Sequence, residues 1–260
     1  ISTPWLHWPD TMVTYLKEYN LLFTGDIGGG YSIPTDIDDS DEKTLKEYSP
    51  FATKYVVTVI GHFREYITKN FDKLKQLGII NETKAVFPAH GLVFRKNPQN
   101  IFKLYTDVAE GNPEKGKILV IYDSMYGYVE SAIKIAIDEL TKNNCKVLIY
   151  KFTDTEYCDI SDLLKDIPNS EALIIGASTY ESSIHPYMRF VISTIIDKAD
   201  YNKPVLAIGI HGWGGAVGKT LTQLMQSSKY RLLETLEFKG KLTQEVENII
   251  RDKTRALLNT

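Results

Sequence analysis

Five short apolar runs in residues 117–260 alternate with helical patterns, and this alternation most constrains how the chain can fold. The runs lie at residues 117–122, 146–150, 172–176, 204–210 and 232–238, and the helical patterns lie at 128–140, 186–198, 216–226 and 243–258. A strand that is apolar along its whole length is typical of a parallel sheet with helices on both faces. The region therefore predicts one doubly wound, five-stranded α/β domain.

The segment 110–116 is rich in Gly, Pro and charged residues, which is typical of a linker. It separates the domain at 117–260 from a first region at residues 1–109. In that region the patterns predict strands at 19–23 and 84–87 and helices at 56–75 and 97–109. The acidic stretch 36–47 is interpreted as a solvated loop or the start of a helix.

Composition excludes several classes of protein. Apolar residues make up 43% and charged residues 24% of the 260 residues, which is ordinary globular usage. The net charge of -3 argues against a nucleic-acid partner. No apolar run approaches the roughly 20 residues of a membrane helix. The two cysteines, Cys145 and Cys158, form no disulfide framework or metal pair, so a reducing cytoplasmic location is expected.

Three loops of the second region carry residues suited to a flavin. The loop after the first strand contains Ser124, Met125, Tyr126 and Gly127, and such a strand-to-helix loop favours a phosphate. The loops after the third and fourth strands contain Ser178, Thr179 and Tyr180, and His211, Gly212, Trp213 and Gly214. In a doubly wound sheet these loops meet beyond the carboxyl ends of the strands. A plain βα turn would explain the first loop alone, but the three together predict a site for flavin mononucleotide (FMN).

In the first region, His7, Asp26 and His90 lie on predicted loops, and two of them follow predicted strands. Two imidazoles and a carboxylate are a plausible ligand set for iron or zinc. Each residue alone has an ordinary structural explanation, such as a surface histidine or an aspartate in a turn. His62 lies within a predicted helix, and His185 precedes one.

At these residues the chain resembles the flavodiiron proteins (A-type flavoproteins). The matching blocks are Leu6-His7-Trp8-Pro9-Asp10-Thr11-Met12, Leu22-Phe23-Thr24-Gly25-Asp26, Phe87-Pro88-Ala89-His90-Gly91, and the loops that start at Ser124 and His211. The resemblance implies that residues 1–109 are the C-terminal portion of an αββα metallo-β-lactamase-like diiron domain. It also implies that residues 117–260 are a flavodoxin-like FMN domain.

The resemblance further implies roles for these residues. His7 and His90 would each be a terminal ligand of one iron, and Asp26 would bridge both. Ser124, Met125, Tyr126 and Gly127 would hold the FMN phosphate. Ser178, Thr179 and Tyr180 would border the flavin ring on one side, and His211, Gly212, Trp213 and Gly214 on the other. The chain departs from the family pattern at Tyr128 and Val129, and at Ala177-Ser178-Thr179 in the second loop.

The activity implied is reduction of O2 to water, of NO to N2O, or of both, with electrons delivered through FMN. Rubredoxin or another reductase would donate them, and a head-to-tail homodimer would bring the FMN of one subunit to the diiron site of the other. Two alternatives stay open. The chain could be a flavodoxin-type electron carrier with a vestigial first region, or a zinc hydrolase of the metallo-β-lactamase type.

The family's remaining ligands come from an N-terminal His-x-Glu-x-Asp-His motif, and no such motif occurs in these 260 residues. A whole αββα domain takes roughly 200–250 residues. We therefore expect Ile1 to be an internal position, and a further portion of roughly 140 residues to complete the first domain.

Overall fold

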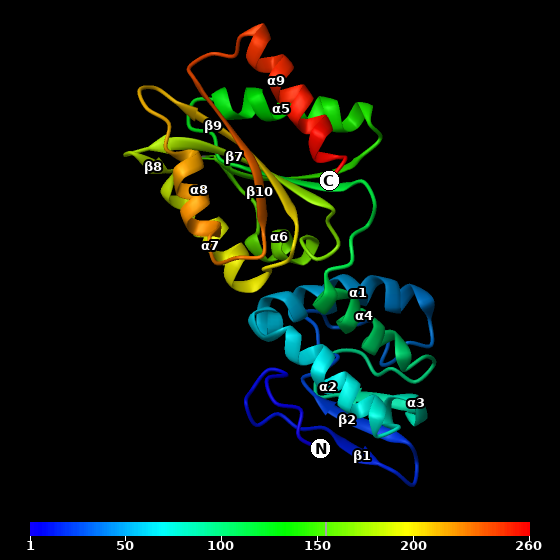
Figure 1. Cartoon of the computed structure of the whole chain (residues 1–260). Helices are drawn as coiled ribbons and strands as arrows, with labels where there is room; N and C mark the ends of the chain where they lie inside the picture. Colours follow the sequence, from blue (N-terminus) through cyan, green and yellow to red (C-terminus); the bar gives the residue numbers. More distant parts are fainter. Residues whose placement is uncertain (154) are drawn as a thin grey trace. The chain divides into compact units, whose positions relative to one another are not determined.

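The computed structural model describes residues 1–153 and 155–260, which form two compact units at residues 1–111 and 112–260 (Figure 1). The division between Gly111 and Asn112 falls within the stretch predicted as a linker. Among the described residues, no helix has both the length and the apolar character needed to cross a membrane.

The second unit is built on a parallel sheet. Its five long strands are β4 (Lys117–Tyr122), β5 (Lys146–Thr153), β7 (Ala172–Tyr180), β9 (Pro204–His211) and β10 (Arg231–Lys239). They are parallel and lie in the order β5-β4-β7-β9-β10, so the predicted doubly wound, flavodoxin-like fold is confirmed. The predicted number of strands was too low. Two short antiparallel strands, β6 (Glu156–Tyr157) and β8 (Ser183–Ile184), bring the sheet to seven, and neither contains an apolar run long enough to predict it.

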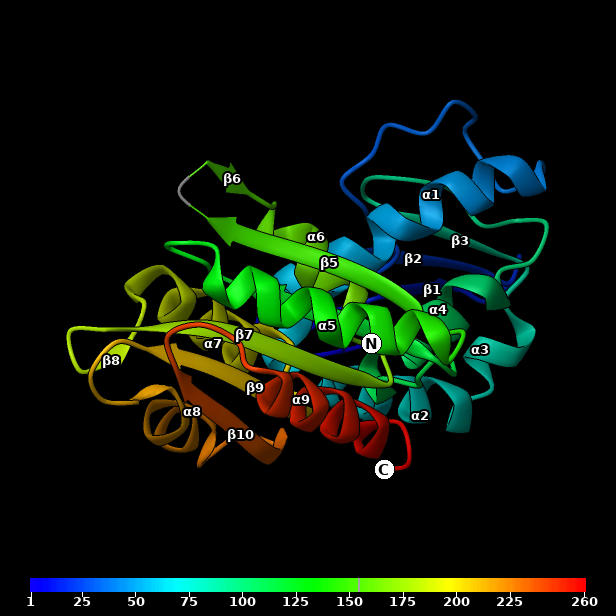
Figure 2. The same ribbon diagram turned by 90° about the horizontal axis from the view of Figure 1, so that it is seen from above.

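Helices cover both faces of this sheet (Figures 1 and 2). The helices α5 (Tyr128–Lys142) and α9 (Gln244–Leu257) pack together on one face. The helices α6 (Ile160–Asp166), α7 (Pro186–Lys198) and α8 (Val217–Met225) cover the other. This double cover explains why every residue of β4 is buried. Helix α6 was not predicted, because its seven residues are too few for a clear helical period.

The first unit contains a three-stranded sheet and a group of helices. The strands β1 (Thr14–Leu16), β2 (Leu21–Gly25) and β3 (Ala85–Pro88) lie in the order β1-β2-β3. Strand β1 is antiparallel to β2, and β3 is parallel to it. The helices are α1 (Glu42–Tyr55), α2 (Glu65–Gln76), the single-turn α3 (Ile79–Glu82) and α4 (Gln99–Glu110).

The prediction of a single helix at residues 56–75 was wrong. Helix α1 begins earlier, at Glu42, where the Asp41 side chain accepts a hydrogen bond from the Lys43 N–H and caps it. A π-helical turn at Val56–Ile60 and a 3-10 turn at Gly61–Phe63 then separate α1 from α2. All five residues of the π-helical turn are β-branched, and such residues favour the α-helix weakly.

The strand β2 has two different faces. Leu22 and Thr24 are buried on one face, whereas Phe23, on the other, is 43% exposed and stacks on Phe87 of β3. Because β2 and β3 are parallel, their carboxyl ends meet at one edge of the sheet, just before Asp26 and His90. This pairing explains how residues 64 positions apart come together.

Candidate functional site

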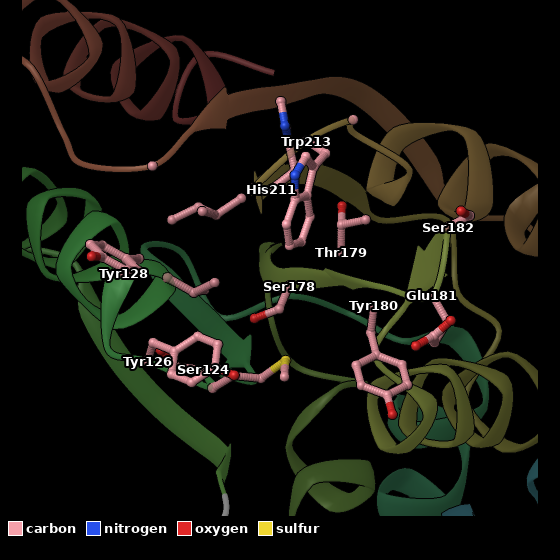
Figure 3. A pocket seen from close by; sticks show the side chains of 16 residues that line it. Ser124, Tyr126, Tyr128, Ser178, Thr179, Tyr180, Glu181, Ser182, His211 and Trp213 are labelled. Atoms are coloured by element: carbon pink, nitrogen blue, oxygen red, sulfur yellow. The ribbon is translucent and has the colours of Figure 1, made fainter.

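A cavity of about 650 Å³ opens at the carboxyl ends of β4, β7 and β9 in the second unit (Figure 3). Its wall is formed by the three segments that the sequence predicted, although Ser178, Thr179 and Tyr180 belong to the end of β7 and His211 ends β9 instead of lying in a loop. Ten of the eleven predicted residues line it, namely Ser124, Met125, Tyr126, Ser178, Thr179, Tyr180, His211, Gly212, Trp213 and Gly214. The eleventh, Gly127, lies at the start of α5. The edge where these strands end is where doubly wound sheets bind ligands.

The start of α5 is suited to a phosphate group. Gly127 precedes the helix with φ 79, a left-handed conformation that glycine adopts without strain, and as the N-cap residue it offers no side chain to the helix N–H groups. The Ser124 Oγ, which accepts a 3.3 Å hydrogen bond from the Glu130 N–H, keeps the loop folded over the first turn. The other N–H groups of the first turn and the positive end of the helix dipole favour an anion here.

The nearby helix α8 lacks this capacity. The Glu237 carboxylate on β10 accepts hydrogen bonds from the Val217 N–H at 2.9 Å and the Gly218 N–H at 3.1 Å. A protein carboxylate therefore already occupies the position that an anion would take. Compared with α8, the start of α5 is therefore better suited to a phosphate.

Aromatic side chains and glycines shape the rest of the cavity. Figure 3 shows Trp213 and His211 across the cavity from Ser124 and Tyr126, with Ser178 between them. The Trp213 side chain is 97% exposed, so it is not a core residue. A Cβ atom built on Gly212 or Gly214 would meet no other atom within 4 Å. This open space between planar side chains fits a flat ring.

Contacts between the loops hold the cavity wall together. The Thr179 Oγ1 accepts a hydrogen bond of 3.2 Å from the Ala216 N–H, which joins the end of β7 to the loop after β9. The buried Asp123 carboxylate accepts from the Ser178 N–H and joins the end of β4 to β7. Asp123 and Glu237 were not predicted as site residues. Asp123 could have been suspected as an acidic residue that ends an apolar strand, but nothing in the sequence connects Glu237 to α8.

In the first unit, Asp26 lies between two imidazoles. Its Oδ2 lies 2.9 Å from the His7 Nε2, and its Oδ1 lies 4.0 Å from the His90 Nε2. All three side chains are partly exposed, and the ring of Tyr55 lies edge-on to His90. The residues that the structure describes nevertheless contain no group of three or more His, Cys, Asp or Glu side chains that could by itself hold a metal ion.

Two buried phenols support the turn that follows Asp26. The Gly28 N–H donates to the Tyr105 Oη at 2.7 Å, and the Tyr48 Oη donates to the Gly28 carbonyl at 2.8 Å. Burial raises the pKa of Tyr48 to about 12 and that of Tyr105 well above its usual value. Both phenols therefore stay protonated at neutral pH, so the turn keeps both hydrogen bonds.

Known proteins with similar sequences and structures carry the same two parts. Residues 120–251 match the flavodoxin family. A nitric oxide reductase from Moorella thermoacetica is 30% identical over 233 residues, and an anaerobic nitric oxide reductase flavorubredoxin from Escherichia coli is 24% identical over 259 residues. These alignments cover 90% and 99% of this chain, but only 57% and 53% of the relatives.

Solved structures agree with this assignment. A mutant flavo di-iron protein from Thermotoga maritima is 49% identical with a TM-score of 0.92, and the match covers 100% of this chain and 62% of that one. The rubredoxin:oxygen oxidoreductase from Desulfovibrio gigas, 22% identical with a TM-score of 0.90, shares the fold over 99% of this chain and 63% of its own. The chain belongs to the flavodoxin family through its second unit and, as a whole, to the flavodiiron proteins. It spans between about half and two thirds of the length of these relatives.

Proposed function

We propose that this chain forms the FMN-binding part and half of the metal-binding part of a flavodiiron oxidoreductase that reduces O2 to water, NO to N2O, or both. One observation carries the proposal. A three-loop cavity suited to FMN and an Asp26 carboxylate placed between two imidazoles occur in the same chain. An electron carrier needs only the first of these, and a hydrolase needs only the second.

In this proposal FMN supplies one- and two-electron chemistry, and the second unit binds and orients it. The loop of Ser124, Met125, Tyr126 and Gly127 holds the phosphate at the start of α5. Ser178, Thr179 and Tyr180 border the ring on one side, and His211, Gly212, Trp213 and Gly214 border it on the other. None of the cavity-lining residues, all within the described part of the chain, is Lys or Arg, so backbone N–H groups and hydroxyls would bind the phosphate.

His7 and His90 would each bind one iron, and Asp26 would bridge the two. The donor types fit, because imidazole and carboxylate suit iron, and the two Asp26 oxygens lie toward different imidazoles. The set is incomplete, so the other ligands would come from polypeptide outside these 260 residues. The stacked pair of the exposed Phe23 and the partly buried Phe87 supports this, since a further layer would bury that apolar face of the sheet.

We extend the proposal to the partners of this chain. A head-to-tail homodimer would place the FMN of one subunit at the diiron site of the other, and rubredoxin or another reductase would donate the electrons. Both cysteines are free thiols, which supports a reducing, cytoplasmic location.

Metal and flavin analysis of the full-length protein tests the proposal. We expect about one FMN and two irons per protomer, and consumption of O2 or NO under a reducing system. One FMN without iron or turnover would instead favour a flavodoxin-type carrier, the alternative consistent with the incomplete ligand set among the described residues. Zinc in place of iron would favour a hydrolase.

Gly29 provides a sharper test of the His90 assignment. A Cβ atom on Gly29 would lie 2.2 Å from the His90 Cε1, so Gly29→Ala should displace the imidazole. We expect metal affinity of the full-length protein to fall about tenfold to 100-fold, as when groups that orient a ligand are lost. Equilibrium binding of Fe²⁺ or Co²⁺ measures this loss.

Gly25→Ala is the control for Gly29→Ala. It strains a residue at φ 59, but its added Cβ would meet no atom within 4 Å. If Gly25→Ala loses as much metal as Gly29→Ala, general loosening of the turn, and not displacement of His90, explains the effect.

A further inference from the structure

Asp123 is a buried carboxylate directly behind the wall of the flavin cavity. It directly follows β4 and is only 1% exposed. Its Oδ1 and Oδ2 lie 3.1 and 3.3 Å from the Ser178 backbone nitrogen, whose N–H donates to the carboxylate. The adjacent Ser124 and the bonded Ser178 both line the cavity (Figure 3).

A negative charge is not needed for these hydrogen bonds. An asparagine carbonyl could accept from the same Ser178 N–H without the free-energy cost of burying an ion. Among the described residues, the charged or titratable group that acts on Asp123 is His185, at the start of α7. The His185 N–H donates to the Ser178 carbonyl at 3.1 Å, so this histidine lies on the other side of the same residue. Stability alone therefore does not explain an acid at position 123.

The titration of Asp123 reflects this unfavourable burial. Burial raises the pKa of the Asp123 carboxyl to about 6, against the opposing effects of the Ser178 hydrogen bonds and His185. The carboxyl is thus ionised at pH 8 and largely neutral at pH 5. No lysine or arginine lines the cavity, as far as the chain is described, to offset its charge.

We propose that Asp123 is a positioning residue for the flavin that also tunes its potential. It holds Ser178 in the cavity wall, and its charge disfavours the extra negative charge of reduced FMN. Charge near the flavin ring is a recognised means of tuning its electronics. The inference rests on the proposed binding of FMN in this cavity. Its consequence is a lower FMN reduction potential, which favours passing electrons onward.

The test compares the dissociation constants of oxidised and dithionite-reduced FMN for the full chain and for Asp123→Asn. At pH 8 we expect the reduced-to-oxidised ratio to fall about tenfold in the variant, because one nearby charge is removed. By linkage, a tenfold fall in this ratio corresponds to a reduction potential of the bound FMN that is about 30 mV higher in the variant, for a two-electron couple. At pH 5 the two ratios should agree within about twofold, since the wild-type carboxyl is then neutral. If Asp123 is the source of the pH dependence of this ratio, the dependence should persist in His185→Gln.

Controls separate this role from a structural one. Asp138→Asn removes an equal charge from the exposed face of α5, outside the cavity, and should leave the ratio unchanged. Asp123→Asn should unfold at the same temperature as the wild type or higher. If it misfolds, Asp123→Ser removes the charge with a smaller side chain.

The possible outcomes distinguish the inference from the proposed function. An unchanged ratio at pH 8 in a folded variant that binds FMN would overturn the inference alone. The same shift at pH 5 and pH 8 would also overturn it, because the charge would not be its cause. Failure of the wild-type chain to bind FMN would overturn both.

Discussion

Replacement of Asp26 with alanine is expected to lower the iron affinity of the full-length protein by more than about 100-fold. Loss of a group that only orients a ligand costs roughly 10- to 100-fold, and Asp26 is proposed as the ligand that both irons share. Its two carboxylate oxygens lie toward His7 and His90, so one substitution removes a donor from both positions. Iron per protomer, measured by elemental analysis after dialysis, checks the prediction.

The FMN content of Asp26→Ala should stay at the wild-type level, because the second unit has its own core. Asp10→Ala is the matched control, since Asp10 is an exposed acid close to His7 in the same loop. Retention of two irons in Asp26→Ala would contradict the bridging role. Equal loss of iron in Asp10→Ala would show that the loop, and not the carboxylate, had been disturbed.

The second large effect concerns Lys203, just before β9. The residue is only 3% exposed, and its Nζ donates to the Pro168 carbonyl at 2.8 Å. Burial lowers the pKa of Lys203 from 10.5 to about 8. Between pH 8 and 10.5 the unfolded chain therefore binds more protons than the folded one. The contribution of Lys203 to the free energy of unfolding therefore rises with pH across that window, by about 3 kcal/mol in all.

Lys203→Met should remove this rise. Between pH 7.5 and 10.5 we expect the unfolding free energy of the wild type to rise by about 3 kcal/mol relative to that of Lys203→Met. Denaturant unfolding at several pH values measures it. Lys229→Met, at an exposed position, should follow the wild type. Parallel pH profiles for wild type and Lys203→Met would show that Lys203 titrates normally in the folded chain.

The sequence identified some residues of the candidate sites but not others. The flavin loops could be predicted because each directly follows a strand of a parallel sheet, where topology alone brings the loops together. Their roles toward FMN stay a prediction, as do those of His7, Asp26 and His90 toward iron. Asp123 and Glu237 could not be assigned, because their roles depend on contacts with Ser178 and α8 that no local pattern encodes.

The sequence by itself determined the doubly wound sheet, since apolar runs without alternation are stable as strands only when helices cover both faces. Only the tertiary structure decided the cap that Glu237 forms on α8 and the approach of His7 to Asp26. The physical reason is the range of the interactions. Apolar periodicity acts within one element, whereas these features come from packing between residues that are distant in the chain.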